Sequence, residues 1–224
     1  MKILSIRKGF QVDHSSTSYE FFAIDKPLNR SEREDVARLS SRARPTRRRV
    51  SFIYHGEWND IPGGWEPLMG KYYDVMYSES YDWWALVMAF ESGQKKIEKI
   101  KKYEFKGSDD LGVMVDSKGR RVIISIHCRL RPEYDFEDDD SYYEEDEEEE
   151  EFETETDRSL LNLLAQNREY LKSGDYRLLY GVWQKYGFEP EGGKESEEKA
   201  PPKVSKMDKL PRPVEHLLSL LERA

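Results

Sequence analysis

Residues 113–130, VMVDSKGRRVIISIHCRL, contain the strongest β-sheet signal in the chain. Apolar side chains recur at every second position in the second half of this stretch, at Val122, Ile124, Ile126, Cys128 and Leu130. Such a period of two is typical of a strand with one buried face. Residues 117–119 end in a glycine and separate this strand from a shorter apolar run, a pattern typical of a β-hairpin. We therefore expect a hairpin that belongs to a larger sheet.

Segments with strand and helix patterns precede the hairpin. Asn29 followed by Glu32 is a capping-box signature for a helix that ends before Pro45. Other helical patterns cover residues 65–76 and 95–102, and strand-like runs cover residues 3–7, 19–24, 47–55 and 84–90. This mixture predicts an α+β fold, and a ferredoxin-like α/β sandwich is the arrangement we expect for residues 1–132.

Charge is distributed very unevenly along the 224 residues. The chain contains 36 Lys and Arg against 45 Asp and Glu, a formal net charge of −9. Residues 133–157 contain 17 of the acidic residues and none of the basic ones, so the rest of the chain has a net charge of +8. A self-repelling segment of this kind is expected to be extended and disordered. The pattern predicts an acidic tract attached to a basic body.

Helical patterns return after the acidic tract. A Leu-rich stretch ends at Gly174, a typical C-cap, and Asp175 begins a second amphipathic stretch, so we expect a helical hairpin over residues 158–188. Residues 189–213 have the Pro/Glu/Lys composition of a linker, and residues 214–224 have the pattern of a short amphipathic helix. The sequence therefore predicts five parts: an α+β domain, an acidic tract, a hairpin, a linker and a final helix.

Apolar stripes on these C-terminal helices suggest a partner-binding surface, because such short helices can hardly bury them alone. We expect an unidentified protein partner to contact the following residues: Leu179, Trp183, Tyr186, Leu217, Leu218 and Leu221. Tryptophans in the first domain are additional interface anchors wherever they are exposed. These are Trp58, Trp65, Trp83 and Trp84.

An arginine-rich stretch suggests contact with an anion or a nucleic acid, because guanidinium groups bind phosphates in a bidentate manner. The candidates lie between residues 38 and 49, where there is no acidic residue: Arg42, Arg44, Arg47, Arg48 and Arg49. Two alternatives remain open, namely a solvated surface and a docking site for the protein's own acidic tract. The RNP motifs of an RNA-binding sheet are absent from the sequence.

One loop carries the residue types of an activated nucleophile. His14 lies beside the hydroxyls of Ser15 and Ser16. A self-satisfied turn and an anion contact are the other interpretations of this loop. His127 and Cys128 are strand neighbours that point to opposite faces, and no zinc-binding spacing is present. We therefore predict no catalytic residue, no metal and no cofactor.

Three segments resemble a bacterial protein family of unknown function: GFQVDHSSTSYEF at residues 9–21, IDKPLNRSEREDVARLSSRA at residues 24–43, and LLNLLAQNREYLKSGDYRLLYGVW at residues 160–183. The resemblance covers most of the chain outside the acidic tract and the linker. It implies a bacterial origin, and it brings no activity, cofactor or catalytic residue.

The function that these patterns favour is a non-enzymatic interaction or accessory protein that uses its C-terminal helices and aromatic surface. One alternative is a nucleic-acid-associated protein whose arginine patch is regulated by its own acidic tract. The other is an enzyme that uses the loop of His14, Ser15 and Ser16. A single cysteine, and no apolar run long enough for a signal peptide or a membrane span, predict a cytoplasmic protein that does not enter a membrane.

Overall fold

The structure is a computed structural model that describes residues 16–55, 61–80, 83–131, 160–187 and 200–222. A seven-stranded antiparallel sheet forms its centre, with the strand order β2-β1-β3-β4-β7-β6-β5. The strands are β1 Ser16–Phe22, β2 Arg49–His55, β3 Val75–Ser80, β4 Trp83–Glu91, β5 Phe105–Lys106, β6 Gly112–Lys118 and β7 Arg121–Cys128. The expected α+β class is confirmed, and the ferredoxin-like arrangement stays a prediction.

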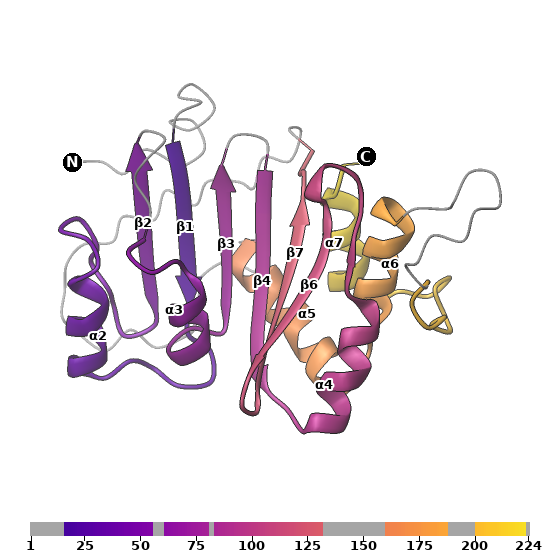
Figure 1. Cartoon of the computed structure of the whole chain (residues 1–224), viewed down its shortest axis with the longest axis horizontal. Coiled ribbons are helices and arrows are strands. Elements are labelled where there is room, and N and C mark those ends of the chain that lie inside the picture. The colour runs from indigo at the N-terminus through magenta and orange to yellow at the C-terminus, as the bar shows by residue number, and fades with distance from the viewer. Residues whose placement is uncertain (1–15, 56–60, 81–82, 132–159, 188–199, 223–224) are drawn as a thin grey trace.

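Helices cover the two faces of this sheet unequally (Figure 1). On the front face, α2 Arg30–Ala37 and α3 Glu66–Lys71 pack over β2, β1 and β3. The back-face core receives α4 Gln94–Ile100, α5 Leu160–Ser173, α6 Arg177–Tyr186 and α7 Arg212–Leu220. Two 3₁₀ turns, η1 Lys101–Tyr103 and η2 Ser108–Asp110, flank β5.

Strand alternation divides the apolar side chains between two cores. On β1, Phe21 enters the front core and Phe22 the back core. The central strand β4 is buried on both faces, with Leu86 and Met88 at the back and Val87 at the front. Burial on both faces explains why residues 84–90 form a continuous apolar run.

Several helix ends form as the sequence predicts. Asn29 caps α2, because its side chain accepts a hydrogen bond from the backbone N–H of Glu32 while the Glu32 carboxylate accepts one from the N–H of Asn29. Gly174 has a φ of +99°, the left-handed conformation that glycine provides after a helix. Asp175 accepts a hydrogen bond from the N–H of Arg177, the first residue of α6, although Tyr176 and not Asp175 occupies the cap position.

The amphipathic helix expected over residues 65–76 is shorter than predicted. α3 ends at Lys71, and Val75 and Met76 belong to β3. Val75 is buried in the back core and Met76 in the front core, which only an extended backbone achieves for adjacent residues. The strand expected at residues 3–7 and the acidic tract lie outside the described residues.

The C-terminal helices share one core with the sheet. Leu164, Leu179 and Leu217 belong to the same buried cluster as Leu86 and Ile124. The chain after α7 also pairs with the chain after β7, through a bridge between Leu130 and Leu221. The five-part division of the chain stays a prediction, but these helices form a layer of the fold. In the part of the chain that the structure describes, no helix is long and apolar enough to cross a membrane.

Candidate functional site

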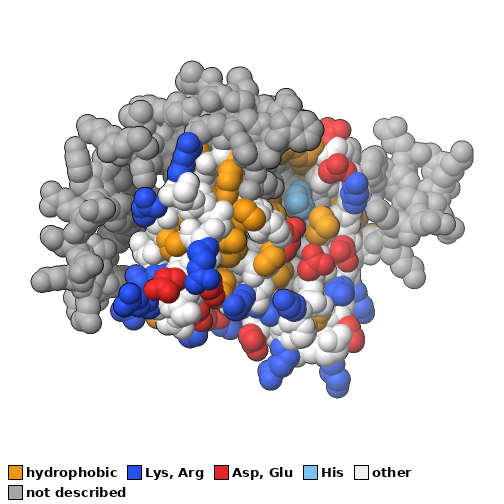
Figure 2. Space-filling view, turned by 60° about the vertical axis from the view of Figure 1, so that its left-hand side comes forward, with side chains coloured by type: hydrophobic (Ala, Val, Ile, Leu, Met, Phe, Trp, Pro, Cys, Tyr) orange, Lys and Arg blue, Asp and Glu red, His pale blue; other side chains and the backbone are white. Residues whose placement is uncertain are grey.

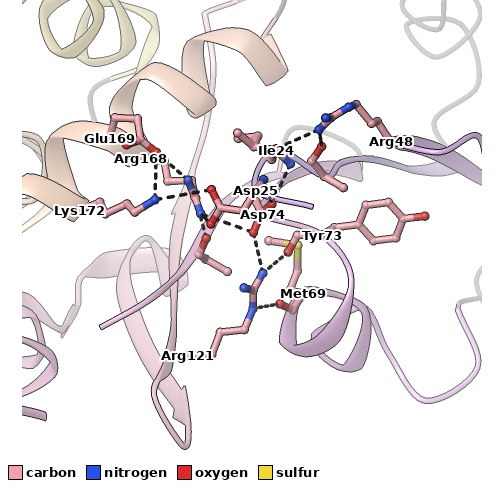
Figure 3. Close-up of polar contacts among 12 residues, drawn as sticks. Ile24, Asp25, Arg48, Met69, Tyr73, Asp74, Arg121, Arg168, Glu169 and Lys172 are labelled. Atoms are coloured by element: carbon pink, nitrogen blue, oxygen red, sulfur yellow. Dashed lines mark hydrogen bonds and ion pairs between the residues drawn. The ribbon is translucent and has the colours of Figure 1, made fainter. Parts of the chain in front are cut away.

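A buried charged network joins the ends of several strands (Figure 3). Its centre is Asp74, which lies directly before β3 and is only 3% exposed. One carboxylate oxygen of Asp74 accepts hydrogen bonds from the backbone N–H groups of Ile24 and Asp25, at 2.7 and 2.8 Å. The other oxygen accepts from Arg121 at 3.0 Å and from Arg168 at 3.5 Å. The network therefore connects β1, β3, β7 and α5.

Both arginines of the network also bind backbone carbonyls. Arg168 is fully buried on α5 and donates to the carbonyl of Ala89 at 2.7 Å and to the carboxylate of Asp25. Arg121 donates to the carbonyls of Met69 and Tyr73 at 2.7 and 2.6 Å. The two side chains thus tie α5 behind the sheet to the end of α3 in front of it.

The contacts of this network connect the helix layers to the sheet and occupy its carboxylates. Burial favours the neutral form of Asp25, but the hydrogen bond and charge of Arg168, with help from Lys172, hold the pKa of Asp25 below its usual value. Asp74 accepts four hydrogen bonds. Because the lowered pKa keeps Asp25 ionised, and because Asp74 is already bound by four donors, both carboxylates are poorly suited to general acid chemistry.

The position of Arg168 in the sequence indicates a buried charge, although the sequence does not show which residue pairs with it. Arg168 lies four residues after Leu164 and three before Leu171, on the apolar stripe of α5. A charged residue in that position needs a buried partner. The partner, Asp74, is distant in sequence and could not be identified from spacing.

The residues expected to bind a partner on the C-terminal helices are mostly buried. Leu179, Leu217 and Leu221 are fully buried, Tyr186 is 3% exposed and Leu218 is 9% exposed. They pack against the back face of the sheet, which supplies the apolar surface that two short helices lack. Trp183 is half-buried and contacts Tyr180, with 5.5 Å between ring centroids. The apolar side chains of these helices are therefore part of the core, and of the six candidates only Trp183 is partly exposed.

Exposed apolar side chains lie instead on the front face, over β4, β7 and β6. Trp83 is 38% exposed and Met114 is 51% exposed, which makes them the most exposed large hydrophobic residues in the part of the chain that the structure describes. Figure 2 shows hydrophobic side chains in the middle of the described surface, with charged side chains to the left, to the right and along the lower border. We call the surface formed by Trp83, Ala85, Met114, Ser125 and His127 the open front face.

Strand register places these residues on one surface. Ala85 of β4 lies opposite His127, and Ser125 lies opposite both Val87 and Met114. Small side chains therefore separate Trp83 from Met114 across about 15 Å, as strand spacing and rise dictate. Burial lowers the pKa of His127, against the opposing effect of Asp110, so the imidazole favours its neutral form. The surface is largely uncharged, with polar groups at its border.

The border beside Trp83 is formed by a charged pair. The guanidinium of Arg129 lies over the Trp83 ring, 5.0 Å from its centroid. The same guanidinium pairs with the carboxylate of Asp109 at 3.4 Å. These contacts hold the indole in place without covering it.

The arginine-rich stretch divides into two groups. Arg42, Arg44 and Arg47 are exposed. Arg48 donates to the carbonyls of Ala23 and Ile24, each at 2.9 Å, and Arg49 lies over the ring of Phe22 at 4.9 Å. Arg48 and Arg49 therefore have structural contacts, and anion binding by this stretch stays a prediction.

The remaining sequence candidates are the loop of His14, Ser15 and Ser16 and the strand residue Cys128. His14 and Ser15 lie outside the described residues, and Ser16 is the first residue of β1, with His55 as its register partner. Cys128 is buried in the back core, where burial raises the pKa of its thiol. Within the described ranges, no group of three or more His, Cys, Asp or Glu is placed to hold a metal ion.

Glu20 is a titratable group that the sequence patterns missed. It lies on β1 with its side chain on the back face, and one of its carboxylate oxygens accepts a hydrogen bond from the Ser51 hydroxyl at 3.2 Å. Burial raises the pKa of Glu20 to about 7, although Ser51 and the charge of Arg49 oppose the change. The hydroxyl of Ser18, two residues earlier, is buried without a hydrogen-bond partner in the described part of the chain.

Comparison with known proteins gives no match to a family model, to a curated protein or to a solved structure.

Proposed function

We propose that this protein acts without catalysis, as an interaction protein, and that its open front face binds an apolar surface of a different protein. The observation that carries the proposal is the exposure of Trp83 and Met114, 38% and 51%, on one face of the sheet. Large apolar side chains that gather on an exposed face mark interaction sites. We place this activity in the bacterial cytoplasm.

The chemistry of the face fits a protein partner. Trp is among the residues that contribute most to binding energy at protein interfaces, and Met adapts to irregular apolar surfaces. The small side chains of Ala85 and Ser125 leave room for aliphatic side chains of the partner between these two anchors. Arg129 and Asp109 supply a charged border of the kind that surrounds interface centres.

This proposal moves the binding surface away from the C-terminal helices. Leu179, Leu217 and Leu221 are fully buried against the sheet, so a partner would have to displace the core to reach them. Such a displacement costs far more than an interface of ordinary size returns. The proposed surface keeps one expected feature, an exposed tryptophan of the first domain as an anchor, in Trp83.

Photo-crosslinking in cells tests the proposal. A photoreactive residue placed at Met114 is expected to give one dominant adduct with another protein, and Trp83→Ala in the same chain is expected to reduce that adduct at least about fivefold. The control is the same photoreactive residue at Gln184, an exposed position on α6.

Three outcomes contradict the proposal: the same adducts from both positions, an adduct from Met114 that is insensitive to Trp83→Ala, or an adduct with a second copy of this chain. The last outcome would assign the open front face to self-association.

A further inference from the structure

Lysines line the exposed side of α4 and the turn that follows it. Lys95, Lys99 and Lys102 follow one another at i, i+4 and i+7, and all three are exposed. Ile97 and Ile100 face the opposite way and are buried in the back core. The helix therefore presents one stripe of ammonium groups to solvent.

The described residues offer these lysines little neutralisation of their charge. Lys95, Lys99, Lys101 and Lys102 form no ion pair with any other described residue. The exposed arginines of α2 are arranged differently, since Arg30 pairs with Glu34 and Arg38 with Asp35. Like charges at i and i+4 slightly destabilise a helix. The lysines of α4 and η1 outnumber Glu98, the one acidic residue of these two elements, which accepts a hydrogen bond from Gln94, so the stripe keeps a net positive charge that attracts an external anionic ligand.

The tip of the β6–β7 hairpin extends this surface. The N–H of Ser92, just before α4, donates to the carbonyl of Arg120 at 2.7 Å, so the hairpin tip lies beside the beginning of the helix. The Arg120 side chain is exposed. We call Lys95, Lys99, Lys101, Lys102 and Arg120 the lysine surface. It adjoins the lower end of the sheet in Figure 1, where β4 leads into α4.

The shape of the lysine surface indicates the class of ligand. A stripe from i to i+7 on a helix is about 10 Å long, which allows contact with neighbouring phosphates of one strand. Tyr103, the nearest aromatic residue in η1, is buried and does not offer a base-stacking platform. The exposed Trp83 and Met114 lie on the front face and not beside α4, so the surface lacks the apolar anchors of a membrane-binding helix.

From these observations we infer that the lysine surface binds the phosphate backbone of a nucleic acid, without reading its sequence. This site lies outside the arginine-rich stretch and is independent of the proposed protein partner. Its chemistry is phosphate recognition by lysine point charges, with affinity that depends strongly on salt.

Fluorescence anisotropy with the full chain tests the inference, using a labelled duplex DNA of about 20 base pairs and an RNA hairpin of similar size in about 50 to 200 mM KCl. Replacing Lys95, Lys99 and Lys102 together by Gln is expected to weaken binding at least about tenfold and to lower the salt slope by about 2 to 3. The two probes distinguish DNA from RNA as the source of the phosphates.

A matched control replaces Lys203, Lys206 and Lys209 together by Gln, because it removes the same number of exposed lysine charges from a different part of the chain. This variant is expected to bind within about twofold of the natural chain. An equal loss in both variants would show an effect of net charge alone and would overturn the inference.

Because the acidic tract can compete with a nucleic acid for the lysine surface, the experiment includes a further variant. In this variant the acidic residues of 144–151 are replaced by Gln in the full chain. Binding that appears only in this version and is lost with the lysine substitutions supports the inference and identifies the tract as a competitor. If neither version binds either probe at the lowest salt, or if the lysine substitutions leave binding unchanged, the inference is wrong.

Discussion

The two faces of the sheet differ in how completely they are covered. The back face is covered by α5, α6 and α7 with α4 beside them, and its side chains on β4 and β7 are buried except for the partly buried Trp84. The front face is covered by α2 and α3 over β2, β1 and β3, and it leaves Trp83 and Met114 exposed over β4 and β6. The difference teaches that the apolar stripes of the C-terminal helices serve stability, and the smaller uncovered area is the surface where we propose that a partner binds.

The largest effect is expected at the charged network, which connects the two faces. Asp74→Ala is expected to lower the free energy of unfolding by about 3 to 5 kcal/mol, because Arg168 would lose its buried partner and two backbone N–H groups would lose their acceptor. Urea denaturation followed by circular dichroism measures this change.

The control for this variant is Glu169→Ala, because the Glu169 side chain is 58% exposed and pairs with the same Arg168. It is expected to cost less than about 1 kcal/mol. Comparable losses in the two variants would show that the network is not a buried connection between the layers.

The next effect compares the two faces directly. Leu179→Ala is expected to cost about 2 to 4 kcal/mol, because it leaves a cavity in the back core. Met114→Ala is expected to stay within about 1 kcal/mol, because that side chain is 51% exposed. Thermal and urea unfolding of the two variants measure these free energies. A small cost for Leu179→Ala would contradict burial of the C-terminal helices and would favour them as a binding surface.

A smaller and pH-dependent effect is expected at Glu20 on the back face. Its pKa of about 7 exceeds the ordinary value of 4.5, so the folded chain binds this proton more tightly than the unfolded chain. The contribution of Glu20 to stability is therefore complete at low pH and is lost as the pH rises from about 4.5 to 7. Its total size is about 3 kcal/mol.

Glu20→Gln removes this titration and keeps the hydrogen-bonding length of the side chain. The difference in unfolding free energy between the variant and the natural chain is expected to grow in favour of the variant across that pH range. A difference that is constant with pH would mean that Glu20 titrates normally.

Local signals in the sequence predicted local structure well. The capping box of Asn29 and Glu32, the hairpin turn at Gly119 and the C-cap at Gly174 all describe contacts within a few residues, and the structure confirms each. The final amphipathic helix was predicted at residues 214–224 and is found at Arg212–Leu220.

Contacts between distant residues account for what the sequence did not predict. The stripe on Leu179 and Leu217 was correctly recognised as apolar, but its partner is a sheet face formed far earlier in the chain. Asp74 and Arg168 carry no spacing signal, because they meet only when α5 docks. Residues 65–76 fitted a helical period, yet burial on both sides of the sheet placed Val75 and Met76 in a strand. Each error therefore reflects tertiary packing that overrides a local pattern.

Labelling of thiols tests the contrast between the two faces most directly, because the chain contains one cysteine and it lies on the back face. In the folded natural chain, Cys128 is expected to react with a soluble thiol reagent at least about a hundredfold more slowly than in urea, since burial both shields the thiol and raises its pKa. Met114→Cys is expected to add one site that reacts at nearly the unfolded rate. Rapid labelling of Cys128 under native conditions would contradict the account, because it would mean that the C-terminal helices do not cover the sheet.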